Sequence, residues 1–172
     1  MDYTNPPDWL VKVERLVNNR LCSYSYGSYV RYLRLKGSER VLDFGSGSGA
    51  AARHLARALV SGGGKLTCVD ISEKWLECAR AELAAYPNVE FRLGEIEHLP
   101  VSDGSVDVVI SNCVINLSTD KAQVLREIYR TLKKGGRMAV SDIVTSGSLP
   151  DEMKKSMSAW AGCIAGAMDV EE

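Results

Sequence analysis

The chain of 172 residues has few aromatic residues, no excess of positive charge and no long apolar run. Aromatic residues make up 7%, and 21 Lys and Arg stand against 22 Asp and Glu, for a formal net charge of -1. A protein that binds nucleic acid through bulk charge usually carries a basic excess or stripe, so this balance argues against such a partner. The longest notable uncharged stretch, residues 156–168, is shorter than the roughly 20 residues of a membrane span.

Paired cysteine motifs are also missing. The chain has five widely spaced cysteines and no CxxC pair. The first seven residues lack the basic start and apolar core of a signal peptide, so we expect a cytoplasmic protein with no disulfide framework. A single cysteine in such a chain is most often a small core residue, and a functional role needs a separate reason.

Strand and helix patterns alternate along the chain, which predicts a single α/β domain over residues 1–172. Short, mostly apolar runs predict strands at residues 40–44, 66–70, 89–93, 106–110 and 137–141. Helical spacing and capping residues predict helices at residues 8–21, 50–60, 72–86, 121–133 and 150–165. The tyrosine-rich segment 24–32 fits neither pattern. We therefore expect a helical cap segment (1–39) and a doubly wound, mostly parallel sheet (40–172), with ligands at the carboxyl ends of its strands.

A glycine-rich loop follows the first predicted strand, at residues 43–49. Its glycines allow a tight turn and a close approach of the backbone to a ligand, and the next helix offers free N–H groups. Gly45, Gly47 and Ala50 fit the dinucleotide-binding fingerprint, so the loop alone does not identify the ligand.

Two acidic residues bear on which ligand the glycine loop binds. Asp70 ends the second predicted strand, where a carboxylate can bind ribose hydroxyls in either kind of site. Asp43 ends the first strand and points a carboxylate into the loop, where it would repel a pyrophosphate but suits an α-ammonium group.

With a third glycine at Gly49, the loop resembles the D-x-G-x-G-x-G loop of class I methyltransferases, which bind S-adenosylmethionine. The resemblance implies that cofactor. It assigns the methionine end to Asp43, Gly45, Gly47 and Gly49, the ribose to Asp70, an adenine face to Ile71, and the adenine edge to Glu95, Ile96 and Glu97. Asn112, which follows the fourth strand, is added to this cofactor-binding set, although it can also face a substrate or cap the next turn.

Two cysteine segments resemble the arsenite methyltransferase family. The first is S-N-C-V-I-N-L at residues 111–117, and the second is W-x-x-C-x-x-G-A at residues 160–167. The resemblance extends from about Tyr26 to the C-terminus and implies that Cys113 and Cys163 are catalytic. Thiolates are the soft ligands that trivalent arsenic prefers, and arsenic held by sulfur keeps a lone pair for the methyl group, so no general base is needed.

One residue departs from the family. Members usually carry a further cysteine in a Y-G-C-G segment, and Ser28 stands at that position here. A hydroxyl is a poor arsenic ligand, so the site needs Cys22, an already methylated substrate, or an external thiol such as glutathione. Two other functions stay open: methylation of a small organic molecule on carbon, oxygen or nitrogen, and a cofactor-binding subunit that has lost catalysis.

The number of predicted strands is also low for this class. The resemblance implies two further strands on the C-terminal side, whereas the sequence predicts about five strands in all. We therefore expect the fifth strand to be an exposed edge. Such an edge favours pairing with a partner chain or a second copy, unless the chain has been shortened at this end.

Overall fold

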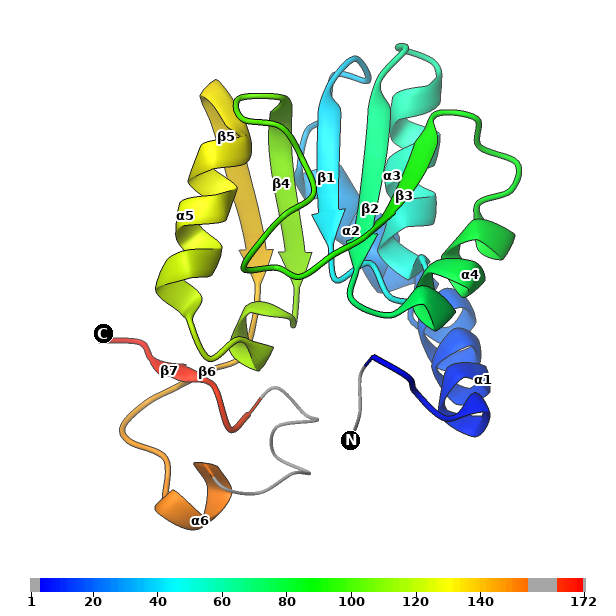
Figure 1. The fold of residues 1–172 in the computed structure, drawn as a ribbon. Helices are drawn as coiled ribbons and strands as arrows, with labels where there is room; N and C mark the ends of the chain where they lie inside the picture. The colour runs from blue at the N-terminus through cyan, green and yellow to red at the C-terminus, as the bar shows by residue number, and fades with distance from the viewer. Residues whose placement is uncertain (1–3, 155–163, 172) are drawn as a thin grey trace.

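The core of the molecule is a parallel sheet, seen in the computed structural model, which describes residues 4–154 and 164–171. Its strands are β1 Arg40–Phe44, β2 Lys65–Asp70, β3 Val89–Leu93, β4 Val106–Asn112 and β5 Leu132–Ser141. They lie in the order β3-β2-β1-β4-β5 and all pairs are parallel (Figure 1). The chain therefore winds outward in both directions from the centre of the sheet, which confirms the predicted doubly wound α/β class.

Helices cover both faces of this sheet. The helical elements of the described residues are α1 Asp8–Leu16, the π-helical turn η1 Val17–Leu21, α2 Ser23–Tyr32, α3 Ala50–Val60, α4 Glu73–Glu82, the 3-10 turn η2 Ile115–Leu117, α5 Lys121–Thr131 and α6 Asp151–Lys154. In Figure 1, α3 and α4 lie on one face and α5 on the other. Buried residues of α2, α3 and α4 form one hydrophobic core with that face, and α5 forms a second core with the opposite face. No described helix is long and apolar enough to span a membrane.

Several helices differ from their predicted bounds. The predicted helix 8–21 is wrong as a single α-helix, because its last five residues form the π-helical turn η1. The unassigned tyrosine-rich segment forms most of α2. Of the predicted helix 150–165, residues 151–154 are helical, residues 155–163 lie outside the described part, and residues 164–167 form a turn. Beyond it, β7 Met168–Asp169 pairs with β6 Val144–Thr145.

The fifth strand lies at an edge of the sheet. Within the described residues, β5 pairs with β4 alone. Met138 is 46% exposed and Val140 is 40% exposed, although the Tyr29 hydroxyl of α2 donates to the carbonyl of Ala139 at 3.3 Å. This edge therefore receives a side-chain hydrogen bond from α2 and still leaves apolar side chains partly exposed.

A network centred on Arg130 holds the segment between β3 and β4 against α5. The Arg130 guanidinium donates to the carbonyls of Leu99 (3.0 Å) and Val101 (2.8 Å) and to the carboxylate of Glu127 (2.7 Å). The same carboxylate accepts the backbone N–H of Leu99 at 2.8 Å. The network thus fixes the segment that carries the predicted adenine-edge residues.

Replacing Arg130 with alanine is expected to lower the free energy of unfolding by about 2 kcal/mol, because it leaves partly buried carbonyls and the Glu127 carboxylate without their donor. Urea denaturation measures this change. Arg126→Ala is the matched control, because Arg126 hydrogen-bonds Gln123 on the same exposed helix face. We expect the control to stay within about 0.5 kcal/mol of wild type, and equal losses in the two variants would contradict the role of the network.

Candidate functional site

The candidate site lies where the strand order reverses, at the carboxyl ends of β1, β2 and β4. The loop from β1 to α3 holds Gly45, Gly47 and Gly49 at φ values of 68°, 52° and 84°, a region that L residues rarely adopt. The backbone N–H groups of Gly45 and Ser46 both donate to the carbonyl of Val69 at 2.8 and 3.1 Å. The loop therefore folds tightly over the end of β2, as the sequence predicts for a ligand cradle.

Gly45 also brings the loop against the segment that follows β4. A Cβ atom on Gly45 would lie 2.3 Å from a methyl carbon of Val114, the residue after Cys113. By contrast, a Cβ atom on Gly47 would meet nothing within 4 Å, so that side of the loop is open. The structure thus brings the glycine loop and the first cysteine segment into contact and leaves space beside Gly47.

Gly45→Ala is expected to weaken cofactor binding by about 10-fold or more, because both the steric overlap and the positive φ distort the loop. Calorimetric titration with S-adenosylhomocysteine measures the change. Gly63→Ala is the control, since Gly63 has a φ of 75° but open space around its Cβ and lies after α3. Equal affinity in the two variants would contradict a specific role for Gly45 and its contact with Val114 in cofactor binding.

Asp43 is the most perturbed acid of the site. Its side chain is 3% exposed, and its Oδ2 has no hydrogen-bond partner among the described residues. Burial raises the pKa of this carboxyl to about 7, and the charge of Asp70 adds to the rise. A buried carboxyl with an unsatisfied oxygen is well suited to a cationic or hydrogen-bond-donating ligand.

Asp70 is held by the backbone around it. One carboxylate oxygen accepts the N–H of Gly47 at 2.8 Å and the other accepts the N–H of Ser72 at 3.0 Å. Burial raises its pKa, and these donors act in the opposite direction. Each oxygen keeps a lone pair, so Asp70 can still accept from ribose hydroxyls while it fixes the glycine loop.

A third carboxyl group, that of Glu14, is close enough to Asp70 for their charges to interact, and it was not predicted from the sequence. Burial raises the pKa of Glu14 on α1, and the charge of Asp70 raises it further. Glu14 lies three residues after Val11, the buried residue of α1, and this spacing was the one available signal that it faces inward. Asp43 and Glu14 are each repelled by Asp70, and such a group of acids fits a ligand that carries an ammonium and a sulfonium group, as S-adenosylmethionine does.

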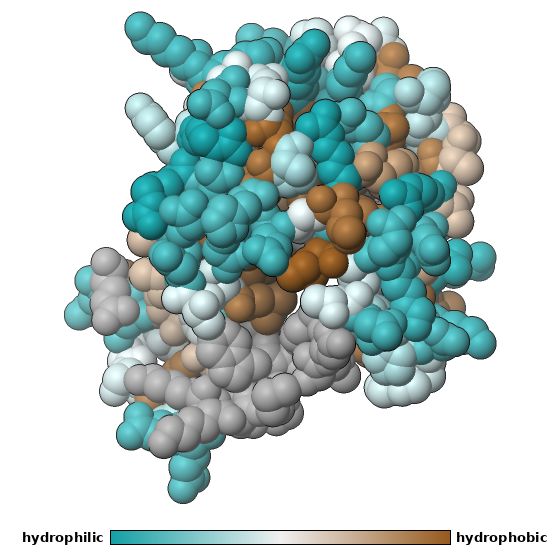
Figure 2. Space-filling model, viewed as in Figure 1, coloured by the Kyte–Doolittle hydropathy of each residue, from teal (hydrophilic) through white to brown (hydrophobic). Residues whose placement is uncertain are grey.

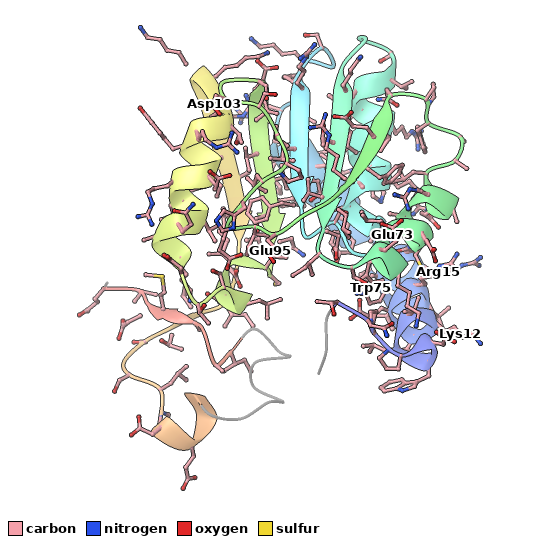
Figure 3. All side chains as sticks on the ribbon, in the orientation of Figure 1. Lys12, Arg15, Glu73, Trp75, Glu95 and Asp103 are labelled. Carbon is pink, nitrogen blue, oxygen red and sulfur yellow. The ribbon has the colours of Figure 1, made fainter. Side chains whose placement is uncertain are left out.

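The residues predicted to contact the adenine ring lie on neighbouring segments. Not all of their side chains are free to make that contact. Ile71 is 43% exposed and Ile96 packs at the border of the second core. The Glu95 side chain is largely exposed near the strand ends (Figure 3), whereas the carboxylate of Glu97 accepts a hydrogen bond from the hydroxyl of Ser118. Hydrophobic side chains also reach the surface in the middle of the face in Figure 2.

Cys113 follows β4 in a strained conformation. Its φ of 55° is positive, which is rare for a residue other than glycine, and its N–H donates to the carbonyl of Ser141 at 2.7 Å. Burial raises the pKa of the thiol, and the charge of Asp142 adds to this. Asn112, next to it, pairs in register with Ser141 at the end of the sheet.

The turn after Cys113 is fixed by Asn116. Its side-chain amide donates to Asp142 at 2.9 Å and to the carbonyl of Ile143 at 2.7 Å, and it is 3% exposed. Asn116 therefore anchors this turn to the chain that leaves β5. Cys163 lies outside the described residues, so its convergence with Cys113 stays a prediction.

Tyr26 lies on α2 and is half-buried. Burial is the largest cause that raises the pKa of its hydroxyl, and the charges of Cys22, Cys113, Glu14 and Asp43 raise it further. The tyrosine therefore has groups from α1, from the start of α2 and from the ends of β1 and β4 around it. In the sequence, Tyr26 stands at the tyrosine of the Y-G-C-G segment, but nothing there indicated that it lies close to Cys113.

Ser28, the residue that replaces the family cysteine, lies on α2. It is half-buried, and its hydroxyl accepts a hydrogen bond from Arg31 at 2.8 Å. Cys68 is fully buried within β2, as expected for a packing residue.

The fold and the acidic glycine loop define the class as that of Rossmann-like methyltransferases. A methyltransferase from Aquifex aeolicus described as S-adenosylmethionine-dependent matches with a TM-score of 0.68 over 86% of this chain and 80% of its own, at 21% identity, and so shares the fold. The family model described as a methyltransferase domain matches residues 35–172. The chain therefore belongs to the methyltransferase-domain family.

Among its relatives, the chain is similar to arsenite methyltransferases. It is 43% identical to the one from Halobacterium salinarum over 85% of this chain and 38% of the relative, and 39% identical to the one from Aquipseudomonas alcaligenes over 97% and 51%. An arsenic(III) S-adenosylmethionine methyltransferase from Chlamydomonas reinhardtii matches in structure with a TM-score of 0.69 and 39% identity, over 77% of this chain and 48% of its own. The chain thus spans about half the length of these relatives or less.

Proposed function

We propose that the protein is an S-adenosylmethionine-dependent methyltransferase that methylates trivalent arsenic. The observation that carries the proposal is Cys113, held in a strained turn whose next residue packs against the glycine loop. Strained backbone often occurs at functional sites, where the surrounding structure maintains it. The similarity to arsenite methyltransferases over most of the chain supports arsenic as the substrate.

The cofactor-binding part rests on the acids and the loop. S-adenosylmethionine supplies a methyl group on a positively charged sulfur. Asp43 accepts from its ammonium group, Asp70 accepts from its ribose, and Gly45, Gly47 and Gly49 allow the backbone to approach its methionine end. Ile71 and Ile96 contact the adenine ring, with Glu95, Glu97 and Asn112 beside it.

The substrate part rests on thiols. Cys113 and Cys163 bind arsenic through sulfur, which leaves the arsenic lone pair as the nucleophile. The Ser28 hydroxyl does not replace a thiolate, and it already accepts from Arg31. We therefore propose an external thiol such as glutathione as the third ligand.

Calorimetry with S-adenosylhomocysteine, followed by product analysis with arsenite and with monomethylarsenite, each plus glutathione, tests the proposal. We expect cofactor binding and a methylated product from at least one arsenical. Cofactor binding without turnover of either arsenical would overturn the arsenic part and favour a binding subunit or a small-molecule methyltransferase. Loss of turnover in Cys22→Ser would show that this cysteine is a third ligand.

For the β5 edge, we propose pairing with another chain, because its apolar side chains stay uncovered. Analytical ultracentrifugation across a concentration series, with Met138→Lys as the edge variant, tests this. A protein that stays strictly monomeric at high concentration, alone and with candidate partners, would contradict pairing at this edge.

A further inference from the structure

A positively charged cavity lies beside the N-terminal helices, and its floor is bonded to the glycine loop through Ser48. Its volume is about 610 Å³, and it lies between α1 and η1 on one side and α3 and α4 on the other. It is lined by Lys12, Arg15, Leu16, Asn19, Arg20, Arg53 and Glu82. Four cationic side chains therefore surround one carboxylate, in a protein whose formal net charge is -1.

Most of this positive charge is not neutralised by the protein. Arg53 pairs with Glu82 at 3.1 Å, which accounts for the single acid of the cavity. Lys12, Arg15 and Arg20 form no ion pair with any residue in 4–154 or 164–171. The nearby Asp8, at the start of α1, forms its ion pair with Lys74. Figure 3 shows Lys12 and Arg15 on α1, next to α4.

Hydrogen bonds of partly or fully buried polar groups hold the floor of the cavity. Asn19 is 5% exposed; its amide donates to the Ser48 carbonyl at 3.2 Å, and its oxygen accepts the Ser48 hydroxyl at 2.8 Å. Arg53 donates to the Asn19 carbonyl at 3.2 Å and to the Ser23 hydroxyl at 2.8 Å. The π-helical turn, a form that often marks functional sites, presents Asn19 to these partners.

We propose that this cavity binds a small molecule that carries two or more phosphate or carboxylate groups. Guanidinium groups recognise both kinds of anion through paired hydrogen bonds, and two of the three unpaired cations are arginines. The volume lies within the range of ligand sites, about 300–1,000 Å³, and exceeds the need of a single inorganic ion. One charge on such a ligand would leave positive charge uncompensated, so a polyanion is favoured.

The test uses sodium pyrophosphate and sodium citrate as separate probes at matched ionic strength, with binding followed by calorimetry and by thermal unfolding. The test variant is Lys12→Ala/Arg15→Ala/Arg20→Ala. The control variant is Lys36→Ala/Lys65→Ala/Lys134→Ala, which removes three exposed lysines at the opposite ends of the strands and changes the net charge equally. All six substituted side chains are exposed, so both variants should fold.

We expect wild type and the control variant to bind at least one probe equally, and the test variant to bind it about 10-fold more weakly or worse. Binding of pyrophosphate alone would indicate a phosphate ligand, and binding of citrate alone a carboxylate ligand. Failure of both probes to bind wild type, or an equal loss in the control variant, would overturn the proposal. Neither readout depends on methyl transfer, so the result is independent of the proposed arsenic chemistry.

Discussion

Asp43→Asn is expected to weaken cofactor binding by about 100-fold and at the same time to stabilise the unliganded protein above neutral pH. The loss of binding follows from the role proposed for Asp43, whose unpartnered oxygen accepts from the ammonium group of the cofactor. The gain in stability follows from burial. A carboxylate without a donor or a counter-ion is costly inside the core, and the isosteric amide removes its charge.

The stability of wild type depends on pH through the same carboxyl group. In the unfolded chain the carboxyl of Asp43 ionises near its ordinary pKa, whereas in the folded protein burial, with the charge of Asp70, raises that pKa to about 7. Between these two values the folded state retains a proton that the unfolded state has lost. The free energy of unfolding of wild type therefore falls as pH rises through this window and stays low above it.

The asparagine side chain of the variant does not titrate, so the variant lacks this fall. We expect the variant to be more stable than wild type by about 2–4 kcal/mol at about pH 8, and the difference to shrink toward about pH 4. Urea denaturation at several pH values measures it. In wild type, S-adenosylhomocysteine should bind more tightly as pH rises through about 7, because Asp43 must ionise to accept a cation.

Glu77→Gln is the matched control, because Glu77 is exposed on α4 and the substitution removes the same formal charge. The control should bind the cofactor like wild type and show no added stability. A variant of Asp43 that binds the cofactor normally would contradict its role in the site. A variant that is less stable than wild type at high pH would contradict the argument from burial.

The strands were predictable because their signal is local. Continuous apolar runs gave the correct order of elements, and β1 and β3 have the predicted bounds. The fifth strand was predicted to start at Arg137, but it starts at Leu132. A pair of glycines, Gly135 and Gly136, usually marks a turn, and here the chain through them stays beside β4 with a shift in register.

The N-terminal part was less predictable because contacts distant in sequence shape it. The apolar spacing of residues 8–21 is that of one α-helix, yet the chain forms a π-helical turn where Asn19 bonds to Ser48 of the glycine loop. Neither the turn nor its partner has a signature in the local sequence. Tertiary hydrogen bonds therefore overrode local propensity at this position.

The same distinction applies to the candidate site. Asp43 and Asp70 could be placed from the sequence, because both end strands and the carboxyl ends of parallel strands meet at one edge. Glu14 and Tyr26 could not, because they come from helices whose docking on the sheet is set by packing. The functional roles of these residues stay predictions, and Asp43→Asn tests that of Asp43.

Cys113→Ser is expected to lower the methylation of arsenicals by about 100-fold or more while cofactor affinity changes less than about twofold. Serine has nearly the same size and keeps the backbone of the turn, but its hydroxyl is a hard, weak ligand for arsenic. Product analysis with arsenite and glutathione, together with calorimetry, measures the two effects. Methylation of a small organic substrate would persist in this variant. The variant therefore also distinguishes methylation of arsenic from methylation of a small organic molecule.

Two further variants exclude unfolding and general thiol chemistry as causes. Cys78→Ser changes a half-buried thiol on α4 and should leave methylation near the wild-type level. Glycine adopts a positive φ without strain, so Cys113→Gly removes about 1 kcal/mol of backbone strain. This gain offsets the extra conformational freedom of glycine in the unfolded chain. The stability of the variant should therefore match that of wild type while methylation is lost. Retained methylation in Cys113→Gly would show that the strained turn serves packing against Gly45, and that arsenic is not bound by Cys113.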